Sequence, residues 1–402
     1  MKSRAERSIA QGSLTNSKHW KTHIEGVYPT HIKNSSGGCV YDLNNKKYVD
    51  MICGLGTNLL GYGHPLVEKE VDTVRSQGKS PSFPHVAEVE LAEQLKQVFP
   101  WVERWKFLKT GSEACSAAIR IARAYTRKDN VFSEGYHGWH DEFVSLTPPA
   151  IGVPQRFADT FIFPLEEKSE SIFRMHSYRA AIITEPVITD DSESRIHWLK
   201  YLREECDKSG SLLIFDEVIT GFRYKQHSVA KAYNIRPDLI IIGKAMANGY
   251  ALAAVGGKAE VMNCDYFVSS TYAGEVTALT AAKAVTQIMR ENPNYSVDRL
   301  WEAGSRFIET FNSYSSKLGF KIEGYATRGV FMGDDLNIAL FMQEACEAGL
   351  LFGKSWFICH SHIPMLDSIL NSCKDILMKM SKALPELKGK MPTSPFSMKA
   401  RT

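Results

Sequence analysis

The sequence predicts an α/β fold with two parts: a large domain that holds a mostly parallel sheet, and a small α+β domain. Three short apolar runs carry this prediction, at residues 181–184, 212–215 and 239–242. They recur about every 30 residues, which is the length of a strand–helix–strand unit. Each run is continuously apolar rather than alternating, which is typical of strands buried on both faces of a parallel sheet.

Amphipathic patterns flank the apolar runs. We expect helices where apolar residues return every three or four positions, over residues 86–99, 112–127 and 197–209. Pro100 follows the first pattern and Gly210 the third, and both residue types commonly end helices. The middle of the chain therefore alternates strands with helices, as a parallel sheet requires.

The two ends of the chain have a different pattern. Apolar residues at 39–41 and 47–49 flank a polar turn, which predicts a β-hairpin, whereas residues 1–36 read as irregular. The last dozen residues are expected to be frayed. Further helical patterns cover residues 299–313, 337–348 and 366–380. We predict three parts: an N-terminal segment, 1–45, that joins the small domain; a large α/β domain, 46–290; and a small α+β domain, 291–402.

Composition excludes several classes of protein. The net charge of the 402 residues is +3, too small to indicate a nucleic-acid partner. No apolar run approaches the ~18 residues of a membrane span, and the first residues lack the apolar core of an export signal. The eight cysteines include no Cys-x-x-Cys pair, so we expect reduced thiols and a cytoplasmic protein. His137 and His140 lack accompanying acids, and we predict no metal site.

Two acids and a lysine follow the three apolar runs, at the point where each predicted strand ends. Glu185 follows the first run, Asp216 the second and Lys244 the third. Because the carboxyl ends of neighbouring parallel strands share one edge of a sheet, we expect these side chains to face one crevice. A lysine in an apolar site can attack a carbonyl, and an acid can hold a pyridinium nitrogen. Pyridoxal phosphate requires this combination.

A phosphate site is also predicted. Gly111 and Ser112 open the helical pattern at 112–127, and free amides at a helix N-terminus bind anions. A nucleotide hydrolase is disfavoured, although the run before Asp216 resembles a Walker B acid. The phosphate loop that must accompany it has Asp238 and Ala245 where a glycine and a hydroxyl residue are required.

Taken together, these segments resemble class III pyridoxal-phosphate aminotransferases of fold type I. The branch that includes glutamate-1-semialdehyde aminomutase is the most similar. The resemblance runs from about residue 25 to 375 and depends on six segments in the family's order. These segments are residues 60–65, 110–114, 135–138, 185–187, 215–223 and 243–244.

The resemblance implies a role for each matching residue. Lys244 would carry pyridoxal 5'-phosphate as a Schiff base, and Asp216 would keep its ring nitrogen protonated. Tyr136 and Val218 would pack on the two ring faces, and Thr271 would reach the phosphate from the partner subunit. The remaining expected contacts are Gly111 and Ser112 with the phosphate, and Glu185, Arg223 and Glu275 with the substrate.

Two departures from the family bear on the substrate. The family's Gly-Asn-Pro run after the threonine is Gly274-Glu275-Val276 in this chain. The N-terminal arginine that the aminomutase uses for a substrate carboxylate has no clear counterpart; Lys18, His19, Lys21 and His23 occupy that stretch.

We therefore predict a homodimeric transaminase with composite active sites. It would move an amino group from an amino acid, with glutamate the expected donor, to an aldehyde or ketone. The favoured acceptor is a sugar-derived carbonyl, such as an oxidised acidic sugar for surface polysaccharide. The alternatives are glutamate-1-semialdehyde 2,1-aminomutase and a catalytically silent binding protein, against which the presence of Lys244 and Asp216 argues.

Overall fold

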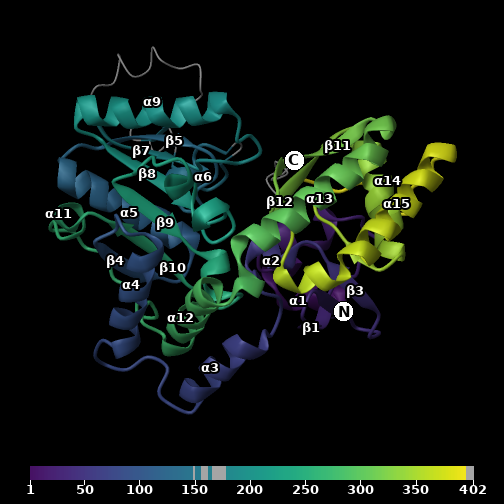
Figure 1. Cartoon of the computed structure of the whole chain (residues 1–402), viewed down its shortest axis with the longest axis horizontal. Coiled ribbons are helices and arrows are strands. Elements are labelled where there is room, and N and C mark those ends of the chain that lie inside the picture. Colours follow the sequence, from purple (N-terminus) through teal and green to yellow (C-terminus); the bar gives the residue numbers. More distant parts are fainter. Residues whose placement is uncertain (148–149, 155–161, 165–177, 395–402) are drawn as a thin grey trace. The chain divides into compact units, whose positions relative to one another are not determined.

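The computed structural model describes residues 1–147, 150–154, 162–164 and 178–394 (Figure 1). It divides into two compact units, one made of residues 1–64 and 298–402, the other of residues 65–297. Most of the terminal segment predicted to be frayed, residues 395–402, lies outside the described residues. No helix within the described residues is both long and apolar enough to cross a membrane.

A seven-stranded sheet forms the centre of the unit 65–297 (Figure 1). Strand β10 runs antiparallel to its neighbours β4 and β9, and every other pairing in this sheet is parallel. The predicted α/β class with a mostly parallel sheet is confirmed. In sheet order the strands are β4 (Arg104–Leu108), β10 (Ala253–Gly257), β9 (Leu239–Ile242), β8 (Leu212–Glu217), β7 (Arg179–Thr184), β5 (Asn130–Glu134) and β6 (Ile162–Pro164).

Helices cover both faces of this sheet. Helix α5, Gly111–Thr126, packs its alanine-rich side against β10, β9 and β7, in a cluster that includes Ile183 and Ile214. Successive residues of a strand point to opposite faces, and the alternate residues Ile182 and Leu213 are fully buried as well. The continuous apolar runs are thus explained by burial on both sides. The other helices of this unit are α3 (Pro65–Arg75), α4 (Val86–Val98), α6 (Asp141–Val144), α9 (Glu193–Ser209), α10 (Val229–Ala232), α11 (Ala259–Met262) and α12 (Val276–Glu291).

The other unit joins the two ends of the chain. Strand β3 pairs antiparallel with β2, which confirms the predicted hairpin, and parallel with β13 from the C-terminal part. One sheet contains β1 (Ile32–Ser36), β2 (Cys39–Asp42), β3 (Lys47–Asp50) and β13 (Leu350–Leu351), and another contains β11 (Phe320–Tyr325), β12 (Arg328–Gly333) and β14 (Ser355–Phe357). The helices are α1 (Lys2–Ser8), α2 (Cys53–Gly56), α13 (Val297–Ser315), α14 (Asp335–Glu347) and α15 (Leu366–Lys382).

The prediction that residues 1–36 are irregular was wrong in two places. Residues Lys2–Ser8 form α1, and Ile32–Ser36 form β1. All five residues of β1 are exposed, and Ala5 is the single buried residue of α1. Because these segments bury almost no side chains, their sequences lack the periodic apolar residues from which a helix or a strand is predicted.

Candidate active site

The three predicted polar residues lie at one edge of the large sheet. Strands β7, β8 and β9 are adjacent and parallel, so their carboxyl ends lie side by side. Glu185 directly follows β7, Asp216 is the second-last residue of β8, and Lys244 comes two residues after the end of β9. This edge is where open α/β sheets bind their ligands.

Lys244 has an unusual backbone conformation. Its φ angle is +42°, in the left-handed region that non-glycine residues rarely adopt. It begins the 3₁₀ turn Lys244–Ala247, whose other three residues are buried. Such a conformation costs of order 1–2 kcal/mol and persists where surrounding structure enforces it, commonly at functional sites.

Asp216 is buried and accepts several hydrogen bonds. Its Oδ1 accepts from the Val218 amide at 3.1 Å. Its Oδ2 lies 2.7 Å from Nδ1 of His137 and 3.3 Å from the Cys115 sulfur. The carboxylate is thus held in one orientation by groups from α5, from the strand end itself and from the loop after β5.

His137 is the closest hydrogen-bonding partner of this carboxylate. Burial disfavours a charged imidazole, but the hydrogen bond and charge of Asp216 outweigh it and raise the pKa of His137. The second ring nitrogen, Nε2, lies 3.0 Å from the Glu134 carbonyl oxygen. Because both ring nitrogens face acceptors, the imidazolium form satisfies both contacts.

The N-terminus of α5 is shaped to hold an anion. Thr110 caps the helix by accepting from the Glu113 amide at 3.2 Å, and Glu113 accepts from the Thr110 amide at 3.1 Å. Within the described residues, the amides of Gly111 and Ser112 donate to no protein acceptor. A Cβ atom on Gly111 would lie 3.1 Å from a methyl group of Val218, so the absence of a side chain lets these elements meet. Free amides at the start of a 16-residue helix suit a phosphate.

Glu185 and Tyr136 are joined directly. The Tyr136 amide donates to Glu185 Oε1 at 2.7 Å, and Gly135 leaves room for this contact, since a Cβ there would lie 2.9 Å from the same oxygen. Behind them the buried Arg195 donates to Glu134 Oε1 at 2.8 Å and to the Glu185 carbonyl at 2.8 Å. These hydrogen bonds hold the residues that follow β5 and β7 in place at the site.

The other predicted site residues have different surroundings. Arg223 is fully buried in the turn after β8, and Thr271 is exposed in the segment before α12. Glu275 caps α12, accepting from the amides of Thr277 and Ala278 at 3.0 Å each, and lies 3.5 Å from Lys109 Nζ. Burial alone would raise the pKa of Glu275, but these hydrogen bonds and the Lys109 charge hold it below its ordinary value.

Two side chains at this edge were not predicted as functional. Cys115 and His137 touch Asp216 across 101 and 79 residues of chain, and no local pattern signals such contacts. His137 does follow Tyr136 directly in a matching segment, and that adjacency is the one signal that could have indicated it.

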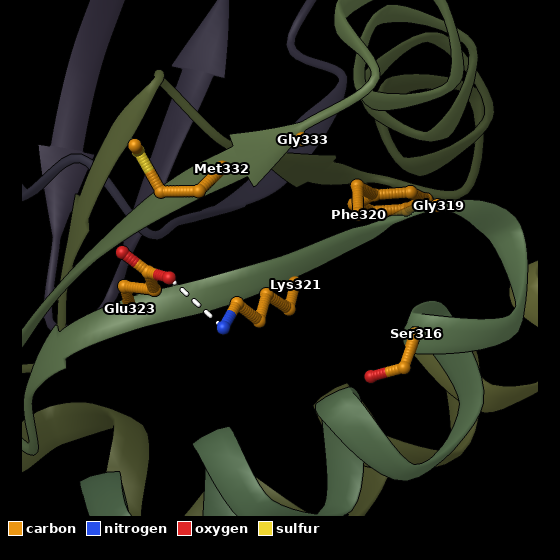
Figure 2. Close-up of a pocket in the computed structure, with 7 residues that line it drawn as sticks. All are labelled: Ser316, Gly319, Phe320, Lys321, Glu323, Met332 and Gly333. Carbon is orange, nitrogen blue, oxygen red and sulfur yellow. Dashed lines mark ion pairs between the residues drawn. The ribbon is translucent and has the colours of Figure 1, made fainter.

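A separate hollow of about 360 Å³ lies in the other unit, on β11 and β12 (Figure 2). It contains none of the predicted site residues. Lys321 and Glu323 form an ion pair of 2.9 Å along it; the Lys321 side chain is exposed to solvent and the Glu323 side chain is partly exposed. It is a surface depression of the hairpin rather than a second strand-end site.

Cys53, Cys359 and His362 form a buried cluster in that same unit. Both ring nitrogens of His362 are already engaged there. Nδ1 accepts from the Cys359 amide at 3.3 Å, and Nε2 donates to the Gly38 carbonyl at 3.1 Å. Hydrogen bonding within the core accounts for this cluster.

Known proteins are similar to this chain in both sequence and fold. A family model described as aminotransferase class-III matches residues 22–384. The chain is 29% identical over 372 residues to a glutamate-1-semialdehyde 2,1-aminomutase from Syntrophomonas wolfei subsp. wolfei, covering 83% of this chain and 85% of that protein. It is 31% identical over 342 residues to a protein of the same name from Pyrobaculum aerophilum, covering 79% of each.

Two solved structures have the same fold. The FumI protein of Sphingopyxis sp. MTA144 in a pyridoxal-phosphate form gives a TM-score of 0.86 at 24% identity, covering 96% of this chain and 97% of that one. An omega-transaminase from Sphaerobacter thermophilus gives 0.84 at 20% identity, covering 95% and 97%.

The fold is that of the pyridoxal-phosphate-dependent enzymes of fold type I. The chain belongs to the class-III aminotransferase family, and it is a pyridoxal-phosphate-dependent transaminase.

Proposed function

We propose that Lys244, Asp216 and the N-terminus of α5 hold pyridoxal 5'-phosphate at the carboxyl edge of β7, β8 and β9. The observation that carries this proposal is the convergence at that edge of a strained lysine, a buried hydrogen-bonded acid and two helix amides that have no acceptor among the described residues. When bound, the cofactor supplies an electron sink for the negative charge that develops at the α-carbon of the amino donor.

Each residue then has a task set by its chemistry. Lys244 would hold the cofactor covalently. Its amine, once released by the donor, would take the donor's α-proton and return it at the cofactor carbon to which the amine had been bound. Asp216 keeps the ring nitrogen protonated through its charge. Gly111 and Ser112 bind the phosphate, while Tyr136 and Val218 pack on the ring. Glu185 and Arg223 are the further substrate contacts that we propose.

The proposed donor is glutamate, and the proposed acceptor is a sugar-derived carbonyl, such as an oxidised acidic sugar destined for surface polysaccharide. Two sequence features argue against the aminomutase substrate: the N-terminal arginine of that enzyme has no clear counterpart, and Glu275 stands in place of an asparagine near the cofactor entrance. Because Glu275 also caps α12 and faces Lys109, its charge is partly offset within the chain. The lack of a clear counterpart for the arginine is therefore the stronger argument against the aminomutase substrate.

A second candidate is glutamate-1-semialdehyde 2,1-aminomutase. It is favoured by the names of the relatives at 29% and 31% identity, and the same site residues would serve it. In that reaction the product contains both the carbon skeleton and the amino nitrogen of the substrate, so no separate amino donor is needed.

One comparison of substrates separates the two candidates. We expect negligible 5-aminolevulinate formation from glutamate-1-semialdehyde, and cofactor-dependent transfer of nitrogen from glutamate to an oxidised acidic sugar. Both rates are measured on the same preparation under identical conditions. Efficient aminolevulinate formation with no sugar amination would reject the sugar acceptor and favour the aminomutase.

We also propose a homodimer in which Thr271 of each chain reaches the phosphate of its partner. The exposure of Thr271 in the single chain supports this role. Large apolar side chains of the same unit are also exposed, including Phe83, Phe267 and Tyr272, as expected of a surface that a second copy covers.

A further inference from the structure

Cys115 is a buried thiol that contacts the acid of the proposed site. It lies on the first turns of α5, the helix whose N-terminus carries the phosphate site, and its side chain is almost wholly buried. Its sulfur is 3.3 Å from Oδ2 of Asp216, a distance at which a thiol donates a hydrogen bond to a carboxylate. None of the roles assigned above uses this thiol.

The protonation state of Cys115 decides what this contact does. Burial raises the pKa of Cys115 well above its ordinary value, and the neighbouring Asp216 charge raises it further. The thiol is therefore neutral and has its proton to donate. A thiolate at this distance would instead repel the carboxylate.

The contact also helps to fix the Asp216 carboxylate in place. A carboxylate oxygen that accepts charge-assisted hydrogen bonds is held in a defined orientation. Oδ2 receives bonds from His137 and Cys115, and Oδ1 receives one from the Val218 amide. These hydrogen bonds hold the carboxylate in one orientation, in which its charge can pair with a protonated ring nitrogen.

We propose that Cys115 is a positioning residue, whose thiol donates to Asp216 and so holds this carboxylate where it pairs with the protonated ring nitrogen of the cofactor. This inference rests on the proposed function. It links both ends of the cofactor to one helix, because the amides of Gly111 and Ser112 and the thiol of Cys115 all belong to α5. Serine retains a donor at this position, whereas alanine and valine do not.

The test uses holoenzyme reconstituted with pyridoxal phosphate that carries ¹⁵N in the ring. We expect the ¹⁵N resonance of the unsubstituted enzyme to have the position of a protonated pyridine. In Cys115→Ala and Cys115→Val it should move toward that of neutral pyridine, and the first half-reaction should slow about tenfold, the effect of losing one hydrogen bond. Cys115→Ser should retain the original resonance and a rate within about threefold. Cys206→Ala, which removes another buried thiol of the same unit, is the matched control and should change neither.

Infrared spectroscopy gives a measurement that does not depend on the alanine and valine variants folding. The S–H stretching band lost in Cys115→Ser identifies this thiol among the eight cysteines. In the unsubstituted protein that band should be shifted to lower frequency than the other S–H bands. An unshifted band, or a ring resonance that is the same in all variants, overturns the proposal for Cys115. An unprotonated ring in the unsubstituted holoenzyme would instead contradict the role given to Asp216 itself.

Discussion

Asparagine in place of Asp216 should leave the cofactor bound but slow transamination by orders of magnitude. An amide is uncharged and cannot hold the ring nitrogen's proton, so the electron sink weakens in the transition state. The substitution also places an amide where His137 and Cys115 now meet a carboxylate oxygen. The rate of the first half-reaction, followed by the change in cofactor absorbance in a single turnover, measures the effect.

Asp207→Asn is the matched control for this substitution. Asp207 is an exposed acid on α9 of the same unit, and its partner is Arg203 at 2.8 Å. We expect this variant to react at the unsubstituted rate. A fall of less than about tenfold for Asp216→Asn, equivalent to roughly 1.4 kcal/mol of barrier, would show that Asp216 does not have the proposed role.

Two inactive variants should restore activity when their chains are combined in one dimer. Lys244→Ala cannot hold the cofactor covalently, and Thr271→Glu places a negative charge where a phosphate is expected, so each homodimer should be nearly inactive. In a mixed dimer one site has Lys244 from one chain and Thr271 from the other. Random mixing makes half of the dimers mixed, each with one intact site, so about one quarter of the original activity should return.

The control for this complementation is Thr271→Ser, which retains the hydroxyl and should be active by itself. The activity is measured on the whole mixture after equal amounts of the two variants are refolded together. If Thr271 serves its own chain, every site in the mixture carries a lesion and no activity returns. Protein that remains monomeric would contradict the composite site more directly.

The sequence predicts the parts of the fold that are buried on both sides. Strands β7, β8 and β9 each contain a continuous apolar run, so they could be identified, and Asp216 and Lys244 followed from the ends of these runs. Strands β4 and β5 could not, because Arg104–Leu108 and Asn130–Glu134 mix charged or polar residues with apolar ones.

Contacts made across long stretches of chain were also beyond prediction. β10 consists of Ala253-Ala254-Val255-Gly256-Gly257, whose small side chains carry little strand signal. It nevertheless fits between β4 and β9, where a side chain on Gly256 would meet Trp105 at 2.5 Å. Likewise, the sequence suggested that Glu275 influences the substrate. Only the structure shows that its side chain also caps the N-terminus of α12.

The position of the cofactor on Lys244 is the central claim, and chemical trapping tests it most directly. Borohydride reduction of the yellow holoenzyme converts the Schiff base with the cofactor into a stable secondary amine, which peptide mapping by mass spectrometry then locates. We predict that the added mass lies on Lys244 alone, and that Lys244→Ala retains no label after reduction. A label on any other lysine, or an unlabelled Lys244 in protein that contains bound cofactor, would contradict the proposed active site.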